Sequence, residues 1–206
     1  MSELEPIIAA FAGGVLPALA WLWFWRREDS VHPEPRRLIA LAFLAGMVAV
    51  AVVIPMEKFA ASYLKTQELW ILTAASTTTL TFIIWSAMEE IIKFVMAKLT
   101  VLRSREDDEP IDPVIYMVTV ALGFAAAENT LFLLSPLSGD SLLQTVLTGN
   151  LRFVGATLLH VLSSAVIGAA IGIAFYKSRS TKRWFTLAGV ILAVLLHSSF
   201  NFLILN

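Results

Sequence analysis

Six long apolar segments alternate with shorter polar segments along the chain. A helix needs about 20 apolar residues to cross the hydrocarbon core of a bilayer. We therefore expect about six membrane-spanning helices, and the polar segments between them should form the loops. The apolar segments cover residues 6–25, 38–53, 69–99, 114–134, 151–176 and 184–205.

The third segment is longer than a simple span requires. At 1.5 Å per residue, a helix over residues 69–99 would extend about 45 Å, whereas the hydrocarbon core is about 30 Å thick. We therefore expect this helix either to protrude from the membrane or to break near residues 77–79, where three threonines follow one another.

Composition favours the same architecture. Hydrophobic residues make up 58% of the 206 residues, charged residues only 15%, and the mean hydropathy is +0.77. Charged residues make up roughly 25% of an ordinary soluble domain, which could not cover so much apolar surface. The predicted fold class is all-α: a polytopic transmembrane helix bundle in which residues 1–206 form a single integral membrane domain. The net charge of −1 gives no reason to expect nucleic acid as a partner.

The basic residues predict the orientation in the membrane. Eleven of the 15 lie in the loops after the first, third and fifth segments, and only two lie in the remaining polar segments. Loops rich in lysine and arginine stay in the cytoplasm. We therefore expect a multi-pass protein of the cell (plasma) membrane whose two termini are both extracytoplasmic.

Several ionisable residues lie inside the apolar segments, where a charge costs at least about 2.5–3.5 kcal/mol. Counting along each helix at 1.5 Å per residue brings these residues to similar depths. They therefore predict one shared polar site within the bilayer. The residues are Glu89, Glu90 and Lys93 in the third segment, Glu128 (followed by Asn129) in the fourth, His160 in the fifth, and His197 (with Asn201 four residues later) in the sixth.

The spacing of these residues suggests how they share the work. Glu89 and Glu90 project about 100° apart on a helix, so one can face a substrate while the other supports it. Lys93 lies four and three residues further on and can reach either carboxylate. A carboxylate in such surroundings can act as a general base. His197 and Asn201 share one helix face and are plausible donors to a developing oxyanion.

Known intramembrane hydrolases of other types lack their required residues here. The chain contains no cysteine, no HExxH zinc motif, no GxSG serine motif and no aspartate inside an apolar segment. Glutamate and histidine are the remaining candidate catalytic residues.

The ordered set of motifs resembles the PrsW family of membrane proteases. The segment from Met88 to Lys93 resembles that family's EExxK motif, and the segment from Gly123 to Asn129 resembles its second motif, which ends in Glu-Asn. His160 and the run from His197 to Asn201 resemble its later histidine motifs. The family is similar to the CPBP group, which includes the CaaX prenyl-proteases with their EExxxR and FxxxH motifs. Lys93 and the lack of a phenylalanine four residues before His160 favour PrsW.

The resemblance implies a glutamic-type intramembrane endopeptidase of a prokaryotic plasma membrane. Its substrate would be a membrane-anchored protein, for example an anti-sigma factor. Glu89 and Glu90 would be the essential acids, one of which activates water; His160 would help to position that water, and His197 and Asn201 would stabilise the tetrahedral intermediate. No cofactor or metal is expected in this interpretation. The supporting residues would be Lys93, Glu128, Asn129 and Arg152, and Arg152, at the outer end of the fifth segment, is better suited to anchoring at the membrane interface.

Two alternatives remain open at this stage. Carboxylate and imidazole groups are also ligands for zinc, manganese or iron, so the same cluster could serve a metal-dependent membrane hydrolase or a metal transporter. Intramembrane glutamate and histidine also form proton relays, so a non-catalytic transport protein is the third interpretation.

Overall fold

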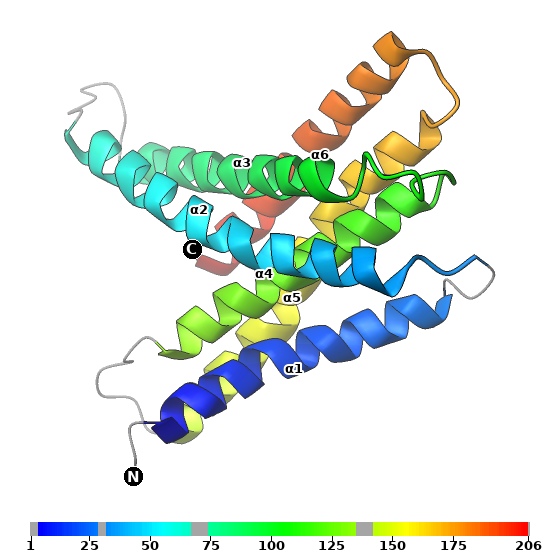
Figure 1. Ribbon diagram of the computed structural model, residues 1–206. Helices are drawn as coiled ribbons and strands as arrows, with labels where there is room; N and C mark the ends of the chain where they lie inside the picture. Colours follow the sequence, from blue (N-terminus) through cyan, green and yellow to red (C-terminus); the bar gives the residue numbers. More distant parts are fainter. Residues whose placement is uncertain (1–3, 29–31, 67–73, 135–141, 206) are drawn as a thin grey trace.

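The computed structural model describes residues 4–28, 32–66, 74–134 and 142–205, and this part of the chain consists of six α-helices with no β-strand (Figure 1). The all-α fold class expected from the apolar segments is therefore confirmed. The helices are α1 (Leu4–Glu28), α2 (Arg36–Thr66), α3 (Ala74–Thr100), α4 (Asp112–Leu134), α5 (Leu142–Ile173) and α6 (Arg179–Leu205).

The helices have the dimensions of membrane spans. Their lengths range from 23 to 32 residues, which corresponds to about 35–48 Å at 1.5 Å per residue. Within the described residues, α2, α4, α5 and α6 each contain a stretch long and apolar enough to cross a bilayer. α3 also has the length, but it carries the charged residues of the predicted polar site. A membrane protein of about six spans agrees with this arrangement.

Two helix boundaries differ from the apolar pattern. The second apolar segment stops at residue 53, but α2 continues past Pro55 as far as Thr66. α3 is helical without interruption from Ala74 to Thr100, so of the two alternatives the break near residues 77–79 is wrong. β-branched threonine lowers helix propensity only slightly, and three in a row do not end this helix.

α4 is the central helix of the bundle. It packs against α1, α2, α3 and α5, and most of its residues are buried. Its sequence is apolar on all sides, as expected for a helix surrounded by other helices. α6 lies at the periphery, where its main contacts in the described part are with α5 and α3. In Figure 1, α4 runs alongside α5 and crosses α2.

α2 and α4 cross through a pair of glycines. A Cβ atom added to Gly46 would lie 2.0 Å from the carbonyl oxygen of Val120, and one added to Gly123 would lie 1.9 Å from that of Phe43. The two backbones are therefore in direct contact, as small residues allow in membrane helix pairs. This crossing fixes α4 five residues before Glu128.

We expect Gly123→Ala to lower the free energy of unfolding by about 1–3 kcal/mol, because the new methyl group meets backbone that cannot rotate away. Gly155→Ala is the control: its Cβ would meet only the ring of Phe200 at 3.5 Å, and alanine favours the helix by about 1 kcal/mol. Thermal unfolding in detergent would measure both variants. Equal changes in the two would contradict the backbone-contact explanation.

Two loops are tied together at one end of the bundle, which we call the tied end. The Tyr116 hydroxyl donates a hydrogen bond to the Glu34 carboxylate, and both side chains are buried. The Arg37 guanidinium donates to Glu106 at 2.9 Å, which joins the start of α2 to the loop after α3. α2 and α4 are therefore held together here as well as at the glycine crossing.

One acid of the tied end gives a pH-dependent stability. Burial raises the pKa of the Asp107 carboxyl to about 6, and the negative charge of Asp112 adds to this rise. The Oδ1 atom of Asp107 is buried without a hydrogen-bond partner in the described structure. Because the folded-state pKa lies above the ordinary value of 3.8, protonation favours the folded state, and stability falls as pH rises from the ordinary value through the folded one.

We expect Asp107→Asn to remove this loss. Its melting temperature should exceed that of the wild type by a margin that grows between acidic and neutral pH and is constant at higher pH. Thermal unfolding across that pH series measures the margin. A margin that does not change with pH would mean that Asp107 does not titrate differently in the folded protein.

Candidate active site

The ionisable residues predicted to share one site come together in the interior of the bundle. α3 contributes three of them and α4, α5 and α6 one each, and their side chains form a continuous chain of contacts. The group consists of Glu89, Glu90, Lys93, Glu128, His160 and His197. The histidines of α5 and α6 contact the acids of α3, and Glu128 of α4 contacts His160.

Glu90 is the buried anchor of the site. Lys93 Nζ donates to its Oε1 at 2.6 Å, and Ser164 Oγ donates to its Oε2 at 3.1 Å. His197 Nδ1 lies 2.8 Å from the same Oε1. Because a carboxylate oxygen accepts, this histidine nitrogen carries the hydrogen, which leaves the electron pair on His197 Nε2 free. Glu90 and Lys93 are both fully buried, and a buried pair persists only when such hydrogen bonds satisfy it.

His160 is held in the same way from the other side. Its Nε2 lies 2.7 Å from Glu128 Oε2, so Nε2 carries the hydrogen and Nδ1 is the acceptor. That Nδ1 lies 3.2 Å from Lys93 Nζ. The His160 ring also packs edge-on against the His197 ring, with a centroid distance of 5.1 Å. Each histidine is therefore oriented by a carboxylate behind it.

Glu89 faces both histidines. Its Oε2 lies 3.7 Å from His160 Nδ1 and 3.8 Å from His197 Nε2. This oxygen is buried and has no hydrogen-bond partner in the part of the chain that the structure describes. Three acceptor atoms thus lie around one space, which Lys93 Nζ also borders through its contact with His160 Nδ1. We call these atoms (Glu89 Oε2, His160 Nδ1 and His197 Nε2) the acceptor triad.

The acceptor triad has the chemistry of a site for a divalent metal ion. Ligand atoms of its three residues lie within 4.8 Å of one another. Two histidines and one glutamate form a known catalytic zinc set, in which ligands about 2.1 Å from a tetrahedral ion are about 3.4 Å apart. A carboxylate behind each ligating histidine is the usual arrangement around such an ion. The donor types and their supports therefore fit a metal, and a water molecule could also donate to two of the three acceptors.

Glu57 is a further acid of the site that the apolar pattern did not reveal. It lies on α2, partly exposed, within hydrogen-bonding range of the Glu89 carboxyl and close to Glu128. The acceptor triad, which includes the Glu89 carboxyl, thus has three further carboxyl groups around it, and among the described residues the ammonium of Lys93 lies beside them. Apolar residues resume after Glu57 in the sequence, which indicates that the helix continues past it. This pattern could have placed the Glu57 carboxyl in the site.

Two of the predicted residues lie away from the acceptor triad, and the side chain of a third lies outside the residues that the structure describes. Asn201 Nδ2 donates to Ser86 Oγ at 3.4 Å, and Asn129 Nδ2 donates to Thr157 Oγ1 at 3.3 Å, so each amide joins two helices. The Arg152 side chain lies outside the described residues. Asn201 is one helical turn from His197, but its amide is engaged with α3.

Known proteins are similar to this chain along most of its length. The model of the family described as "PrsW family intramembrane metalloprotease" matches residues 34–206. "Protease PrsW" of Geobacillus kaustophilus is 26% identical over 97% of this chain and 81% of the relative. Its namesake in Bacillus subtilis is 24% identical over 96% and 84%, and that of Shouchella clausii is 31% identical over 60% and 53%. No solved structure matches.

Proposed function

Because the chain belongs to the PrsW family of intramembrane metalloproteases and is therefore an intramembrane protease, we propose that it is an endopeptidase that hydrolyses a peptide bond of a membrane-anchored protein at the acceptor triad. The observation that carries this proposal is the convergence of three buried acceptor atoms on one space, with an oxygen of Glu89 that has no partner among the described residues.

Glu89, His160 and His197 would hold a divalent metal ion in this site. This differs from the metal-free site expected from the sequence. The excess of carboxyl groups around the acceptor triad supports a cation, since buried negative charge needs compensation. When bound, such an ion lowers the pKa of coordinated water and polarises the substrate carbonyl.

The surrounding residues orient the ligands and supply charge. Glu128 accepts from His160 Nε2 and Glu90 accepts from His197 Nδ1, so both rings present the unprotonated nitrogen to the acceptor triad. Lys93 neutralises Glu90 and, among the described residues, places a positive group beside the acceptor triad. Its Nζ can donate to negative charge that develops on a carbonyl oxygen beside His160. Burial of these groups keeps bulk water away from the site.

A second candidate is the metal-independent glutamic protease, in which Glu89 activates a water molecule directly. The position of Lys93 favours it, because Nζ lies 3.2 Å from His160 Nδ1 and places a positive charge beside the space that a metal ion would occupy. A water molecule there would donate to two of the three acceptors. His197 would then donate to the oxyanion only after its Nε2 takes up a proton, and Asn201 only after release from Ser86.

Cleavage in proteoliposomes distinguishes these possibilities. The panel consists of tagged single-span proteins and includes an anti-sigma factor, the substrate class that the family resemblance suggests. Cleavage that is lost with a chelator and restored by zinc supports the metal-dependent enzyme. Cleavage that survives chelation in metal-free protein supports the second candidate. A folded protein that cleaves no member of the panel in either condition would overturn the protease proposal.

We further propose that the protein is a single domain of the plasma membrane with its tied end in the cytoplasm. The arginine-rich loops at that end support this orientation. Because the chain has no cysteine, single cysteines introduced at the exposed positions Ser180, at the start of α6, and Ser62 can be labelled without background. A membrane-impermeant maleimide added to intact cells should label the Ser62 variant alone, and labelling of the Ser180 variant instead would reverse the orientation.

We expect Glu128→Ala to weaken metal binding about 10–100-fold, because His160 loses the acceptor that fixes its ring and tautomer. Glu128→Gln should weaken metal binding less, since its amide oxygen can still accept a hydrogen bond from His160 Nε2. Competition with a chelating dye measures the affinity, and Glu109→Ala at the tied end is the control. Unchanged affinity in Glu128→Ala would exclude the supporting role.

A further inference from the structure

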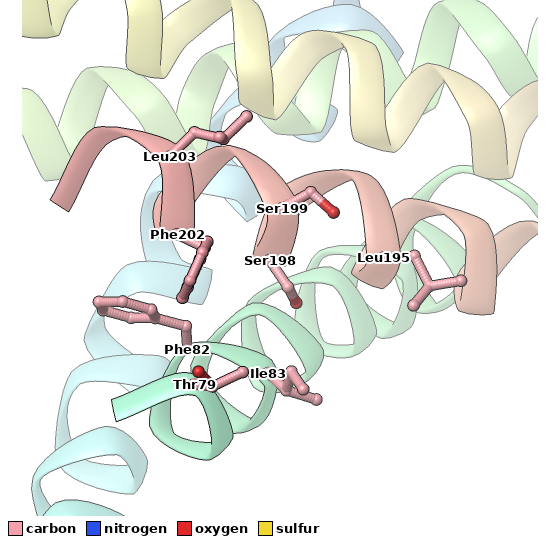
Figure 2. A pocket seen from close by; sticks show the side chains of 8 residues that line it. All are labelled: Thr79, Phe82, Ile83, Leu195, Ser198, Ser199, Phe202 and Leu203. Carbon is pink, nitrogen blue, oxygen red and sulfur yellow. The ribbon is translucent and has the colours of Figure 1, made fainter. Parts of the chain in front are cut away.

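A groove lies between α3 and α6 beside the acceptor triad. Its volume is about 440 Å³. Figure 2 shows Phe202 and Ser198 directed from α6 toward Phe82 and Thr79 of α3, with Leu195 at the opposite end. Its lining comprises Thr79, Phe82, Ile83, Leu195, Ser198, Ser199, Phe202 and Leu203.

On α6 the groove begins beside a residue of the acceptor triad, and on α3 it ends about two helical turns before one. Ser198 follows His197 in the chain, and Phe82 lies one turn before Ser86, which is itself one turn before Glu90. The hydrogen bond from Asn201 to Ser86 joins the same two helices at this point. The groove and the acceptor triad are therefore neighbouring parts of one helix interface.

The dimensions of the groove suit a short stretch of extended chain. Along α6 it covers residues 195–203, which corresponds to about 12 Å at 1.5 Å per residue. An extended peptide rises about 3.3 Å per residue, so three or four residues would fill that length. An intact helix, about 10 Å across with its side chains, would not fit in this volume.

The lining combines apolar side chains with hydroxyl groups. Ser198 Oγ donates to the carbonyl of Val194 at 2.6 Å, so its oxygen can still accept a hydrogen bond, and the Ser199 side chain is exposed. A chain that unwinds within hydrocarbon leaves backbone N–H and C=O groups that need partners. Hydroxyl groups among apolar side chains supply such partners to a peptide backbone. A lipid acyl chain has no polar group that could form hydrogen bonds with them.

The open side of the groove faces outward from the bundle. Only 22% of the apolar span of α6 is buried, the lowest fraction among the four candidate spans. Leu195 and Leu203 on its rim are exposed. A chain segment can therefore enter from the bilayer without passing through the buried core around α4.

We propose that this groove binds the three or four residues on one side of the scissile bond, as an apolar, locally extended part of a membrane-embedded substrate. The proposal rests on the proposed function and adds the place and the conformation in which the substrate is held. Because Ser198 of the groove directly follows His197 in the chain, a segment lying in the groove would have its next peptide bond near the His197 side of the acceptor triad.

Photo-crosslinking tests occupancy independently of cleavage. A photoreactive amino acid is placed at Ile83 or Leu195 in the Glu89→Gln background, and at Leu44 on the exposed face of α2 as the control. The probe is the tagged single-span panel in proteoliposomes. We expect substrate adducts from both groove positions and at least several-fold fewer from Leu44. Adducts with lipid alone at the groove, or equal adducts at all three positions, would overturn the proposal.

Narrowing the groove tests its use in the reaction. Ser199→Trp adds volume at an exposed position of the groove, and we expect it to reduce the cleavage rate at least 10-fold with unchanged metal content. Leu44→Trp should have no effect. Ser199→Ala keeps the space and removes only the hydroxyl group, so it should slow cleavage less than Ser199→Trp. If the wild type cleaves a substrate and Ser199→Trp cleaves it at the same rate, the groove proposal is wrong and the protease proposal stands. If substrate crosslinks to the groove but the wild type cleaves nothing, the protease proposal is wrong and the groove is a binding site only.

Discussion

Glu89→Gln is expected to reduce the cleavage rate at least about 1,000-fold, a loss of about 4 kcal/mol of transition-state stabilisation. In the metal-dependent enzyme the variant loses an anionic ligand, and metal ions contribute several kcal/mol to such reactions. In the metal-independent enzyme it loses the general base. The fold should persist, because glutamine has the same shape and the affected oxygen has no hydrogen-bond partner in the described structure.

The assay for Glu89→Gln combines initial cleavage rates in proteoliposomes with metal content and thermal unfolding. Glu106→Gln is the control, since it changes an exposed acid that pairs with Arg37 far from the acceptor triad. Loss of cleavage together with loss of metal assigns Glu89 as a ligand, and loss of cleavage from metal-free protein assigns it as the base. A Glu89→Gln variant with wild-type activity would remove the acceptor triad from the mechanism.

Lys93→Met is expected to lower the free energy of unfolding by about 3–5 kcal/mol, the largest stability change we predict. The substitution keeps an unbranched side chain in the same space but leaves the Glu90 carboxylate buried without its ammonium partner. Breaking a buried ion pair from one side has this cost, because the remaining charge stays out of water. Ser164 and His197 still donate to Glu90, but neither replaces the lost charge.

A double variant isolates the ion pair from general packing effects. Lys93→Met combined with Glu90→Gln removes both charges, and we expect it to recover a substantial part of the lost stability. Lys58→Met, at an exposed position, should change stability by no more than about 0.5 kcal/mol. Unfolding in detergent measures all four proteins. If the double variant is less stable than Lys93→Met alone, the two side chains do not act as a charge pair.

The helices and most of the ionisable residues of the site could be predicted from the sequence, because both depend on large free energies of transfer between water and the bilayer. Charged groups in long apolar segments are costly, so Glu128, His160 and His197 stood out and were expected at one depth. The structure brings the two histidines to Glu89 and Glu90 on α3, and Glu128 to His160. The 100° between adjacent residues on a helix likewise anticipated that the two glutamates have different surroundings.

Details set by small energies or by tertiary packing were not accessible in the same way. Pro55 is a common helix breaker, but α2 continues through it to Thr66, and Glu57 was therefore overlooked. The direction of the Asn201 amide depends on a partner from another helix, Ser86, 115 residues away in the chain. The role of each histidine nitrogen depends on which carboxylate lies behind the ring, which only the folded geometry provides.

The peripheral position of α6 links occupancy of the site to the cohesion of the bundle. α6 contributes one atom to the acceptor triad, while α3 and α5 contribute the other two, so a ligand held by all three binds only when α6 is docked. By mass action such a ligand stabilises the docked state by about 2.7 kcal/mol at a concentration 100 times its dissociation constant. The least buried helix of the four candidate spans would then be held in place by the chemistry of the site as well as by apolar packing.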